Sequence, residues 1–186
     1  MKQQSASQTV GPYLRIGLIY GGEKQWNLVR EGTIGEQIRI TGVIYDGEGV
    51  PVPDAMIEIW QPDANGFFNH PNDPNQAKAD PSFRGFGRSE TRNGGAFEFK
   101  TIKPGSLDGS APYVNVNVFA PGMLVHAITR IYFADEPANE TDPVLSELDE
   151  QRRQTLIATR DDSGDVPAYH FDIHIQGEQE TVFFNP

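Results

Sequence analysis

Residues 113–119 read Tyr-Val-Asn-Val-Asn-Val-Phe, and this stretch is the clearest guide to the fold class. Valine occupies positions 114, 116 and 118, while tyrosine, asparagine and phenylalanine occupy the positions between and beside them. Successive side chains of a β-strand point to opposite faces, so the three valines share one face. The stretch therefore predicts a strand with one face on an apolar core and the other outside it.

The same alternation recurs on both sides of this stretch. Further strands are predicted at residues 36–45, 55–60, 96–100, 124–133, 168–175 and 181–184. In the stretch 168–175, the residues expected to face the core are Tyr169, Phe171, Ile173 and Ile175. The chain also contains 19 Gly and 14 Pro, which favours many turns. Seven or eight short strands joined by turns predict an all-β fold, a two-sheet antiparallel β-sandwich.

The remaining segments predict one helical region and one arm. A short helical segment is expected near residues 141–159, as one helix or two, because Pro143 suits a first turn and Leu145, Leu148 and Leu156 follow at roughly helical spacing. Residues 1–30 are irregular and are predicted to be an extended N-terminal arm that packs on a partner subunit. Residues 31–186 are predicted to form a single β-sandwich domain, with a long polar loop at residues 61–84.

Composition argues against several classes of function. The 186 residues carry 15 basic and 26 acidic side chains, a net charge of -11, so we expect no nucleic-acid partner. Cysteine is absent, which excludes disulfides, thiol nucleophiles and thiolate metal sites. The N-terminus is polar, and no stretch approaches the roughly 20 apolar residues that span a bilayer. We therefore expect a cytoplasmic protein that does not enter membranes.

The four histidines give only weak candidates for a metal site. His170 and His174 share a predicted strand face but lie about 13 Å apart along it, too far to bind one metal easily. Asp172 lies between them, yet a solvated polar face is the favoured interpretation. His70, in the polar loop, and His126, near a strand start, are interpreted as incidental.

Arg130 is a stronger candidate for a binding role, because it interrupts an otherwise apolar strand. Arginine is rarely buried without an anionic partner, so Arg130 is predicted to lie on an exposed face, to form a structural ion pair, or to bind an anionic ligand. The sequence contains no glycine-rich phosphate loop and no Gly-x-Ser-x-Gly elbow. The residues alone therefore favour a binding or assembly role over a self-contained active site.

Six segments, in order along the chain, resemble the intradiol ring-cleavage dioxygenases. The N-terminal and C-terminal ones are similar to the alpha-type subunits of the two-chain members of that family. The segments are Ser7–Leu18, Gly42–Gly47, Pro53–Gly66 (Pro-Asp-Ala-Met-Ile-Glu-Ile-Trp-Gln-Pro-Asp-Ala-Asn-Gly), Phe83–Arg88, Thr101–Gly105, and Tyr169–Glu178 with Glu180–Phe184.

The resemblance implies a β-sandwich and a ferric iron held by two tyrosines and two histidines. The matching positions here are Phe68, Leu107, Tyr113 and Asn115. The alignment around Leu107 can shift by a residue, but no tyrosine lies within five residues of it. One tyrosine beside these other residues cannot hold Fe(III), so we predict a vestigial iron site, with no metal, no cofactor and no catalytic residue on this chain.

This pattern resembles the alpha-type subunit, which pairs with an iron-bearing beta subunit in a larger hetero-oligomer. The resemblance implies an oxidoreductase of aromatic catabolism in the β-ketoadipate pathway, which uses O₂ to convert 3,4-dihydroxybenzoate into 3-carboxy-cis,cis-muconate. The isolated chain is predicted to be inactive, and Fe(III) is expected in the beta subunit.

Substrate-binding residues are also implied, at the interface with the beta subunit. They are Thr9, Gly11, Pro12 and Tyr13 on the arm, and Arg130. A guanidinium beside a partly dry pocket offsets the cost of desolvating the substrate carboxylate. An alternative for Thr9 and Tyr13 is that they only pack at the interface.

Two other functions remain open from the sequence. The chain is a non-catalytic β-sandwich binding or scaffold protein derived from this family, or it is a self-sufficient enzyme with relocated iron ligands. The residues available for relocation are Tyr20, Tyr45, Tyr132, Tyr169, His170 and His174. They fall on separate elements without ligand-like spacing, which disfavours the second possibility.

Overall fold

The computed structural model describes residues 6–19, 25–91 and 94–185, and for residues 12, 14 and 15 it describes the backbone alone. Strands in this part of the chain follow one continuous path in the order β3-β2-β5-β6-β7-β8-β1-β4, and β9 pairs with β1. The path begins with β3 (Phe86–Glu90), β2 (Met56–Trp60), β5 (Tyr113–Phe119) and β6 (Ala127–Phe133). It continues through β7 (Ile157–Asp161), β8 (Ala168–His170), β1 (Gln37–Tyr45) and β4 (Ala96–Ile102), with β9 (Ile173–His174) beside β1.

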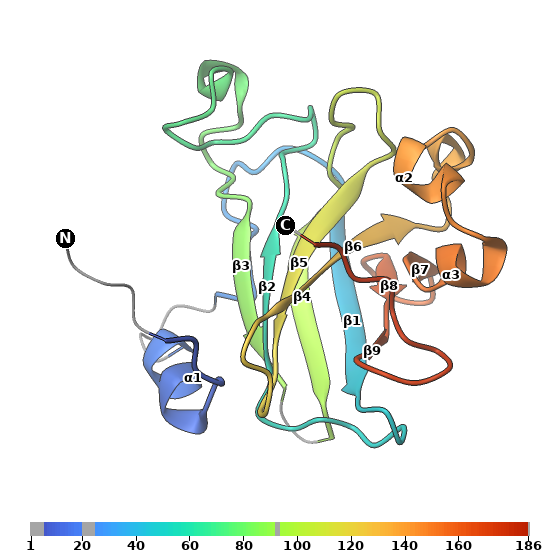
Figure 1. Ribbon diagram of the computed structural model, residues 1–186. Helices are drawn as coiled ribbons and strands as arrows, with labels where there is room; N and C mark the ends of the chain where they lie inside the picture. The colour runs from blue at the N-terminus through green and yellow to red at the C-terminus, as the bar shows by residue number, and fades with distance from the viewer. Residues whose placement is uncertain (1–5, 20–24, 92–93, 186) are drawn as a thin grey trace.

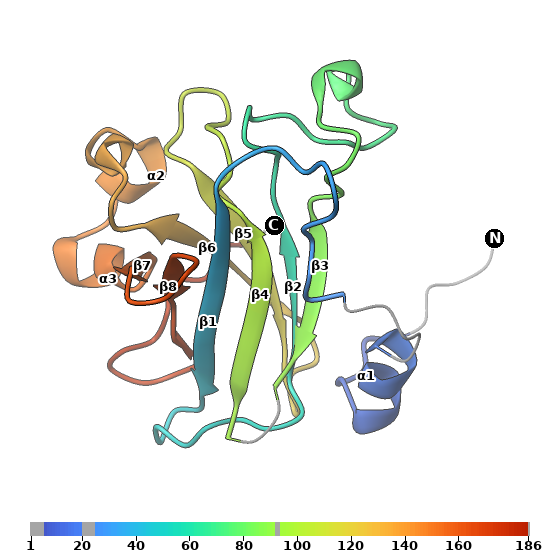
Figure 2. The ribbon, with the colours of Figure 1, turned by 180° about the vertical axis from the view of Figure 1, so that it is seen from behind.

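The path folds back on itself into two layers, and β7 is the turning point. One layer comprises β3, β2, β5 and β6, and the other comprises β8, β9, β1 and β4. β7 pairs with β6 through Tyr132 and Ile157, and with β8 through Arg160 and Tyr169. Figures 1 and 2 show the layers from opposite sides. The predicted two-sheet β-sandwich is confirmed, although β1–β8, β1–β9 and β6–β7 are parallel pairs.

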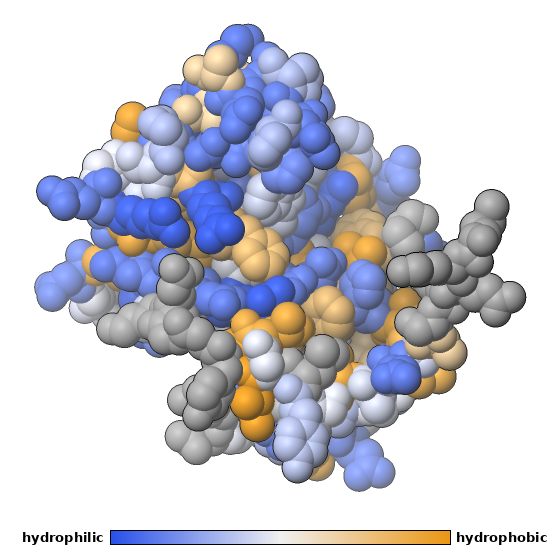
Figure 3. Space-filling model, turned by 90° about the vertical axis from the view of Figure 1, so that its left-hand side faces the viewer, coloured by the Kyte–Doolittle hydropathy of each residue, from blue (hydrophilic) through white to orange (hydrophobic). Residues whose placement is uncertain are grey.

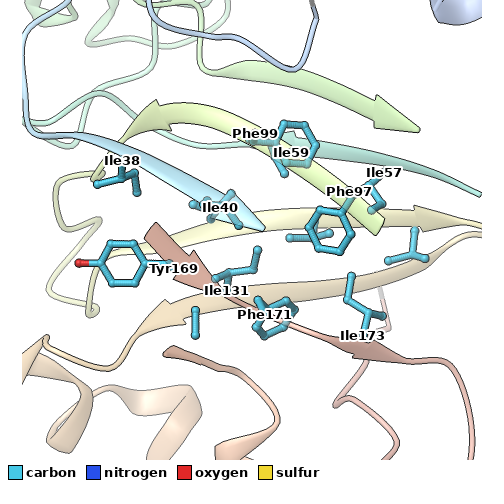
Figure 4. Close-up of a cluster of buried hydrophobic side chains, with 14 of the residues drawn as sticks. Ile38, Ile40, Ile57, Ile59, Phe97, Phe99, Ile131, Tyr169, Phe171 and Ile173 are labelled. Carbon is cyan, nitrogen blue, oxygen red and sulfur yellow. The ribbon is translucent and has the colours of Figure 1, made fainter. Parts of the chain in front are cut away.

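The core lies between the layers and is built from the alternating positions of the strands. Val114, Val116 and Val118 are completely buried, as the sequence predicts. Facing them from the second layer are aliphatic and aromatic side chains (Figure 4), among them Ile38, Ile40, Phe97, Phe99, Tyr169, Phe171 and Ile173. Close packing of these side chains removes a large apolar area from water, which is the main stabilising contribution to such a fold.

The predicted strand 168–175 is divided into β8 and β9 by a side-chain contact. The amide of Phe171 donates to the carbonyl of Thr41 at 2.8 Å, but the amide of Val43 donates to Asp172 Oδ1, also at 2.8 Å. The carboxylate thus takes the place of a ladder acceptor. Between these bonds the two backbones cross so closely that a Cβ added to Gly42 would lie 1.8 Å from the carbonyl oxygen of Phe171.

Two strands, β3 and β7, are absent from the sequence prediction because their inward positions are not hydrophobic in an obvious pattern. The inward residues of β3 are Gly87 and Ser89. The Leu28 side chain occupies the space above Gly87, since a Cβ there would lie 2.5 Å from its Cδ1. When another segment provides the hydrophobic side chain at an inward position, the strand itself shows no alternation of hydrophobic and polar residues.

The predicted helical segment at 141–159 is correct only in its first part. It contains α2 (Pro143–Ser146) and α3 (Glu150–Gln154), after a 3₁₀ turn at Pro137–Glu140; another 3₁₀ turn lies at Gln76–Lys78. Residues 157–161 form β7, so the helical interpretation of residues 157–159 is wrong. Leu145 of α2 and Leu156, in the turn before β7, are both buried in one small cluster. Their spacing in the sequence resembles that of a helix face, although no single helix contains both.

The N-terminal region is not extended throughout, because Pro12–Ile19 forms the helix α1. Pro12 is its first residue, a position where the missing amide proton has no cost. The helix lies beside β3 (Figure 1). Arg88 Nη1 of that strand donates to the carbonyl of Leu18 at 3.3 Å. Farther along, Leu28 is buried in the core and its amide donates to the carbonyl of Lys100 on β4. The helices in the described part of the chain are all too short or too polar to cross a bilayer.

Replacing Gly42 by alanine tests the close crossing of β1 with the segment between β8 and β9. We expect Gly42→Ala to lower the free energy of unfolding by about 3 kcal/mol, because backbone atoms must separate to admit the methyl group. Urea unfolding monitored by circular dichroism measures this. Gly164→Ala is the control, because the added Cβ would meet only the Val166 carbonyl oxygen at 3.6 Å. Equal stability of the two variants would contradict the prediction.

Candidate functional site

Polar and aromatic side chains gather on the outer face of the layer formed by β3, β2, β5 and β6. The strand registers place Phe86, Trp60, Asn115 and Arg130 side by side in one row across this layer. The next row holds Tyr113 opposite Tyr132. Because the valines of β5 point into the core, these neighbouring residues point the other way. The outer face therefore carries the polar and aromatic side chains of these strands, whereas the inner face forms the core.

The Arg130 guanidinium is held among aromatic groups. Its Cζ lies 4.2 Å from the ring centre of Tyr113 and 5.3 Å from that of Phe184, distances at which cation–π attraction operates. Its Nη1 donates to the Tyr132 hydroxyl at 3.3 Å. Within the described ranges, no carboxylate lies within ion-pair distance of Arg130. The predicted alternative of a structural ion pair is therefore not seen among these residues, and the positive charge is available to an external anion.

Tyr132 links Arg130 to a buried carboxylate. The Tyr132 hydroxyl donates to Asp142 Oδ1 at 3.3 Å. The same carboxylate caps α2 by accepting from the amides of Val144 and Leu145, and its Oδ2 accepts from the amide of Ala111. Burial raises the pKa of Tyr132 to about 12, although the neighbouring guanidinium of Arg130 acts in the opposite direction. The phenol therefore stays protonated near neutral pH and can donate to Asp142 while it accepts from Arg130.

The four positions predicted for iron ligands gather at one end of this outer face. Phe68 stacks on Trp60, with ring centres 5.3 Å apart, and Trp60 pairs with Asn115. Tyr113 lies beneath Arg130. Leu107 follows a loop whose backbone touches the Phe68 loop, since the amide of Gly105 donates to the carbonyl of Asp63 at 2.9 Å. The fold thus brings the corresponding segments together.

The side chains at these four positions do not fit a ferric ion. Tyr113 offers one phenolic oxygen, whereas Phe68 and Leu107 offer no donor atom and Asn115 offers only a neutral amide. His70 is near, with its ring 5.9 Å from that of Trp60, but it stands edge-on to that ring rather than beside Tyr113. Throughout the described residues, no group of three or more histidine and acidic side chains is placed to hold a metal ion. Imidazole and anionic oxygen groups are the ligands expected for this iron, and the four side chains supply at most one of them, so they do not suit iron.

The arm residues and Arg130 do not form one pocket within the chain. Thr9 Oγ1 accepts from the amide of Gly122, at the turn between β5 and β6, at 2.8 Å. Arg130 lies four residues beyond His126, which directly precedes β6 at the end of that turn, so the two regions are separated by about 13 Å along the chain. Gly11 is half-buried, and Tyr13 is 88% exposed. The side chain of Pro12 lies outside the described part of the structure.

Exposed hydrophobic residues occur on α1 and in the turn to which Thr9 is bonded. The exposed hydrophobic residues include Tyr13 and Ile16 on α1, and Leu124 and Val125 in the β5–β6 turn. Figure 3 shows hydrophobic patches in the lower half of this side of the molecule, whereas the upper part is mostly hydrophilic. Exposed apolar surface of this kind is characteristic of regions that associate with another chain.

His170 and His174 lie on one part of the surface, and His126 lies on another. His170 Nε2 is 3.1 Å from Asp172 Oδ1, and His174 stacks on Tyr45 with ring centres 4.9 Å apart. Both histidines line an open hollow of about 420 Å³ beside α3 and β7. His126 stacks instead on Phe119. Of the other tyrosines considered as relocated ligands, Tyr132 and Tyr169 are bonded to separate carboxylates, and Tyr20 lies outside the described residues.

A second cluster of charges joins the two layers at the β7 edge. Asp135 accepts from Lys103 Nζ at 3.0 Å, from Arg160 Nη1 at 2.8 Å and from the Tyr169 hydroxyl at 2.9 Å. Burial acts to raise the pKa of Asp135, but the bonds from Lys103 and Tyr169 outweigh it, and the pKa lies below its usual value of 3.8. All of these residues interact with one another, so the cluster is structural.

Comparisons with known proteins show what the chain is similar to. Residues 20–177 match the protein family described as Dioxygenase. The protocatechuate 3,4-dioxygenase alpha chain of Pseudomonas putida is 40% identical over 198 residues, covering 98% of this chain and 96% of the relative.

The chain belongs to the intradiol ring-cleavage dioxygenase family.

Other members of the intradiol dioxygenase family show how this chain relates to the rest. The protocatechuate 3,4-dioxygenase beta chain of Burkholderia cepacia is 32% identical, covering 83% of this chain and 71% of the relative. The solved intradiol ring-cleavage dioxygenase of Tetranychus urticae is 22% identical, with a TM-score of 0.65, covering 83% of this chain and 87% of that one. The latter likeness shows that the β-sandwich is the fold of the family. The similarity to separate alpha and beta chains indicates that this chain is one kind of subunit of a two-chain intradiol dioxygenase.

Three residues of the outer face were not predicted from the sequence to assist Arg130. Tyr132 was considered only as a relocated iron ligand, although its position two residues from Arg130 on the same strand places both on one face. Asp142 precedes Pro143, a sequence signal for a helix cap, but that signal does not reveal its contact with Tyr132. Phe184 reaches the site through a bridge to Ile128, which nothing in the local sequence indicates.

The Asp135 cluster predicts a specific dependence of stability on acid. A carboxyl with a lowered pKa in the folded state stabilises the fold above its unfolded pKa, and this contribution is lost as pH falls through the folded value. We therefore expect the melting temperature of the native protein to fall more steeply below pH about 4 than that of Asp135→Asn. Thermal scans from pH 7 to pH 3 measure this. Parallel pH profiles for the two proteins would remove Asp135 as a stabilising group.

Proposed function

We propose that this chain is the alpha subunit of a protocatechuate 3,4-dioxygenase and that it completes the substrate pocket of an iron-bearing beta subunit. The assembled enzyme would cleave 3,4-dihydroxybenzoate with O₂, between the two hydroxylated carbons, to give 3-carboxy-cis,cis-muconate. The observation that carries the proposal is the outer face of β5 and β6, where the iron-ligand positions lack ligands but Arg130 keeps an uncompensated charge. The similarity to curated alpha chains over nearly the whole length supports it.

The chemistry of Arg130 suits the proposed substrate. The substrate carries a carboxylate, whose transfer from water into a pocket is unfavourable unless it meets a positive group. A guanidinium binds a carboxylate through two parallel hydrogen bonds, and in this chain its charge is not neutralised by a described carboxylate. The rings of Tyr113 and Phe184 lie beside it, 4.2 and 5.3 Å from Cζ. Arg130 is therefore assigned to the substrate carboxylate.

The arm supplies the second contact between the subunits in this proposal. Thr9, Gly11, Pro12 and Tyr13 would reach the substrate pocket of the beta subunit, as part of residues 1–30 packing on the partner, while residues 31–186 form the sandwich domain. The exposure of Tyr13 and the separation of the arm from Arg130 support a pocket shared between chains. We place the enzyme in the cytoplasm, in agreement with the absence of cysteine and of a long apolar segment.

Iron content and activity test the subunit assignment. We expect the isolated chain to bind no stoichiometric iron, to lack the visible tyrosinate-to-iron absorption and to take up no O₂ with protocatechuate. Co-expression with a beta-type chain, which carries both tyrosines and both histidines, should give an active complex with about one iron per chain pair. Elemental analysis, absorption spectra and oxygen uptake measure these outcomes.

Two results would contradict the assignment. Iron with tyrosinate absorption in the pure chain would mean that the chain carries its own site. A chain that never binds the beta-type chain, and leaves the activity of that chain unchanged, would instead indicate a scaffold or binding protein derived from the family.

Removal of the guanidinium tests the role of Arg130. In the assembled enzyme, Arg130→Ala is expected to raise the KM for protocatechuate roughly tenfold or more, because a hydrogen bond to a charged group contributes about 1.5–3 kcal/mol. Steady-state kinetics measure this, and thermal unfolding checks that stability changes less. Arg39→Ala is the matched control, since Arg39 is an exposed strand arginine paired with Glu98 at 2.9 Å. An unchanged KM for Arg130→Ala would exclude Arg130 from the pocket.

A further inference from the structure

The orientation of the Arg130 guanidinium is fixed by a hydrogen bond at one of its nitrogens. Nη1 donates to the Tyr132 hydroxyl at 3.3 Å, whereas Nε and Nη2 donate to no residue in the described ranges. Nε and Nη2 together form one edge of the planar fork, and such an edge binds both oxygens of a carboxylate. Tyr132 takes one of the two Nη1 protons, whereas the Nε–Nη2 edge has no bond within the described ranges and stays open to a ligand.

The Tyr132 hydroxyl is itself held in place from the other side. It donates to Asp142 Oδ1 at 3.3 Å, and Asp142 is only 1% exposed. Three backbone amides, those of Ala111, Val144 and Leu145, donate to the same carboxylate at 2.9–3.0 Å. A carboxylate with so many donors cannot rotate away without leaving buried amides unsatisfied. Tyr132 therefore joins Arg130 to a buried carboxylate that is held by three backbone amides.

The two aromatic rings restrain the guanidinium in a different way. Tyr113 and Phe184 lie within 6 Å of Cζ and limit the tilt of the guanidinium plane. Phe184 comes from the C-terminal segment, which is tied to β6 by the hydrogen bond from its amide to the carbonyl of Ile128, at 2.8 Å. The two rings restrict the plane of the Arg130 guanidinium, and the bond to the Tyr132 hydroxyl restricts its rotation within that plane.

We propose that Tyr132 is a positioning residue for the substrate carboxylate: by anchoring Arg130 Nη1 to the buried Asp142, it presents the Nε–Nη2 edge to the substrate. Phe184 assists by holding the guanidinium plane. This inference rests on the proposed function, and it assigns part of the affinity for 3,4-dihydroxybenzoate to a hydroxyl group that does not touch the substrate. Pre-ordering a long side chain lowers the conformational entropy lost on binding, which is how such a group acts on affinity.

The same fold contains a chemically matched control. Tyr169 is also completely buried, and its hydroxyl likewise lies between an arginine and an aspartate. It accepts from Arg160 Nη1 at 2.8 Å and donates to Asp135 Oδ1 at 2.9 Å. This trio lies at the β7–β8 edge, and its arginine already has carboxylate partners. Removing either hydroxyl perturbs a buried tyrosine, but only the Tyr132 hydroxyl contacts Arg130.

The test uses the assembled two-chain enzyme with Tyr132→Phe, Tyr169→Phe and Arg130→Ala in this chain. We expect Tyr132→Phe to raise the KM for protocatechuate about threefold to tenfold with kcat within twofold, because ground-state positioning is lost. Inhibition by 3,4-dihydroxybenzamide, the uncharged analogue, should not change. Tyr169→Phe should leave all three quantities unaltered. Phe184→Leu, which avoids the buried network, is a second variant expected to raise the KM in the same way.

The outcomes separate this inference from the function on which it rests. A native KM in both Tyr132→Phe and Phe184→Leu, together with a raised KM in Arg130→Ala, would overturn the positioning role and leave the subunit assignment intact. Equal increases for Tyr132→Phe and Tyr169→Phe, or an equal loss of affinity for the benzamide, would show a general structural effect and would also overturn it. A native KM for Arg130→Ala would refute the assignment of Arg130 itself.

Discussion

The burial of alternating side chains between the two layers is the constraint on which the rest of the structure depends. Val114, Val116 and Val118 occupy the inner face of β5, so Tyr113 and Asn115 must lie on the outer one. The same rule places Arg130 and Tyr132 together on β6. A shift of one residue in β6 would turn Arg130 toward the core. The same shift in β5 would turn the three valines toward the surface. The hydrophobic pattern therefore fixes the position of the polar face as firmly as it fixes the core.

On this polar face, the four positions that match the iron ligands of the family hold, in the described part of the chain, one phenol, one neutral amide and two side chains without a donor atom. The loops of Phe68 and Leu107 still meet, and Tyr113 and Asn115 still lie on the strand between β2 and β6. Phe68 stacks on Trp60, with ring centres 5.3 Å apart. Arg130, in contrast, retains both its charge and an ordered set of neighbours. The proposed role as a subunit that assists a partner rests on this combination of missing iron ligands and a cation that has no ion-pair partner among the described residues.

Much of the fold can be predicted from the sequence, because hydrophobic residues alternate along the strands that build the core. The strands near 37–45, 113–119 and 168–175 are examples, each with buried residues at alternate positions. β3 escaped prediction because Leu28 supplies the apolar group above Gly87. The helix was predicted to run too far because Leu145 and Leu156 meet in space from different elements. Local patterns cannot report contacts that the tertiary fold creates.

In the candidate site, too, some residues could be predicted from the sequence and others could not. Arg130 was recognisable as a charged residue in an apolar strand, and the resemblance to the family indicated the four positions without iron ligands. The partners of Arg130 were not recognisable, since Asp142 and Phe184 are distant in sequence and reach it only through the folded chain. α1 was also missed, because eight residues with Gly17 and Ile19 carry little helical signal of their own.

The hydrogen bond between Thr9 and the amide of Gly122 has a consequence for assembly. A free arm would lose the conformational entropy of each of its residues when it docks on another protein, at about 1–2 kcal/mol per residue. Here Val10 is already buried and Thr9 is already tethered to the β5–β6 turn, so part of that ordering is complete in the single chain. Less of the binding free energy is then needed to immobilise the arm, and association is favoured by a contact that the interface itself does not contain.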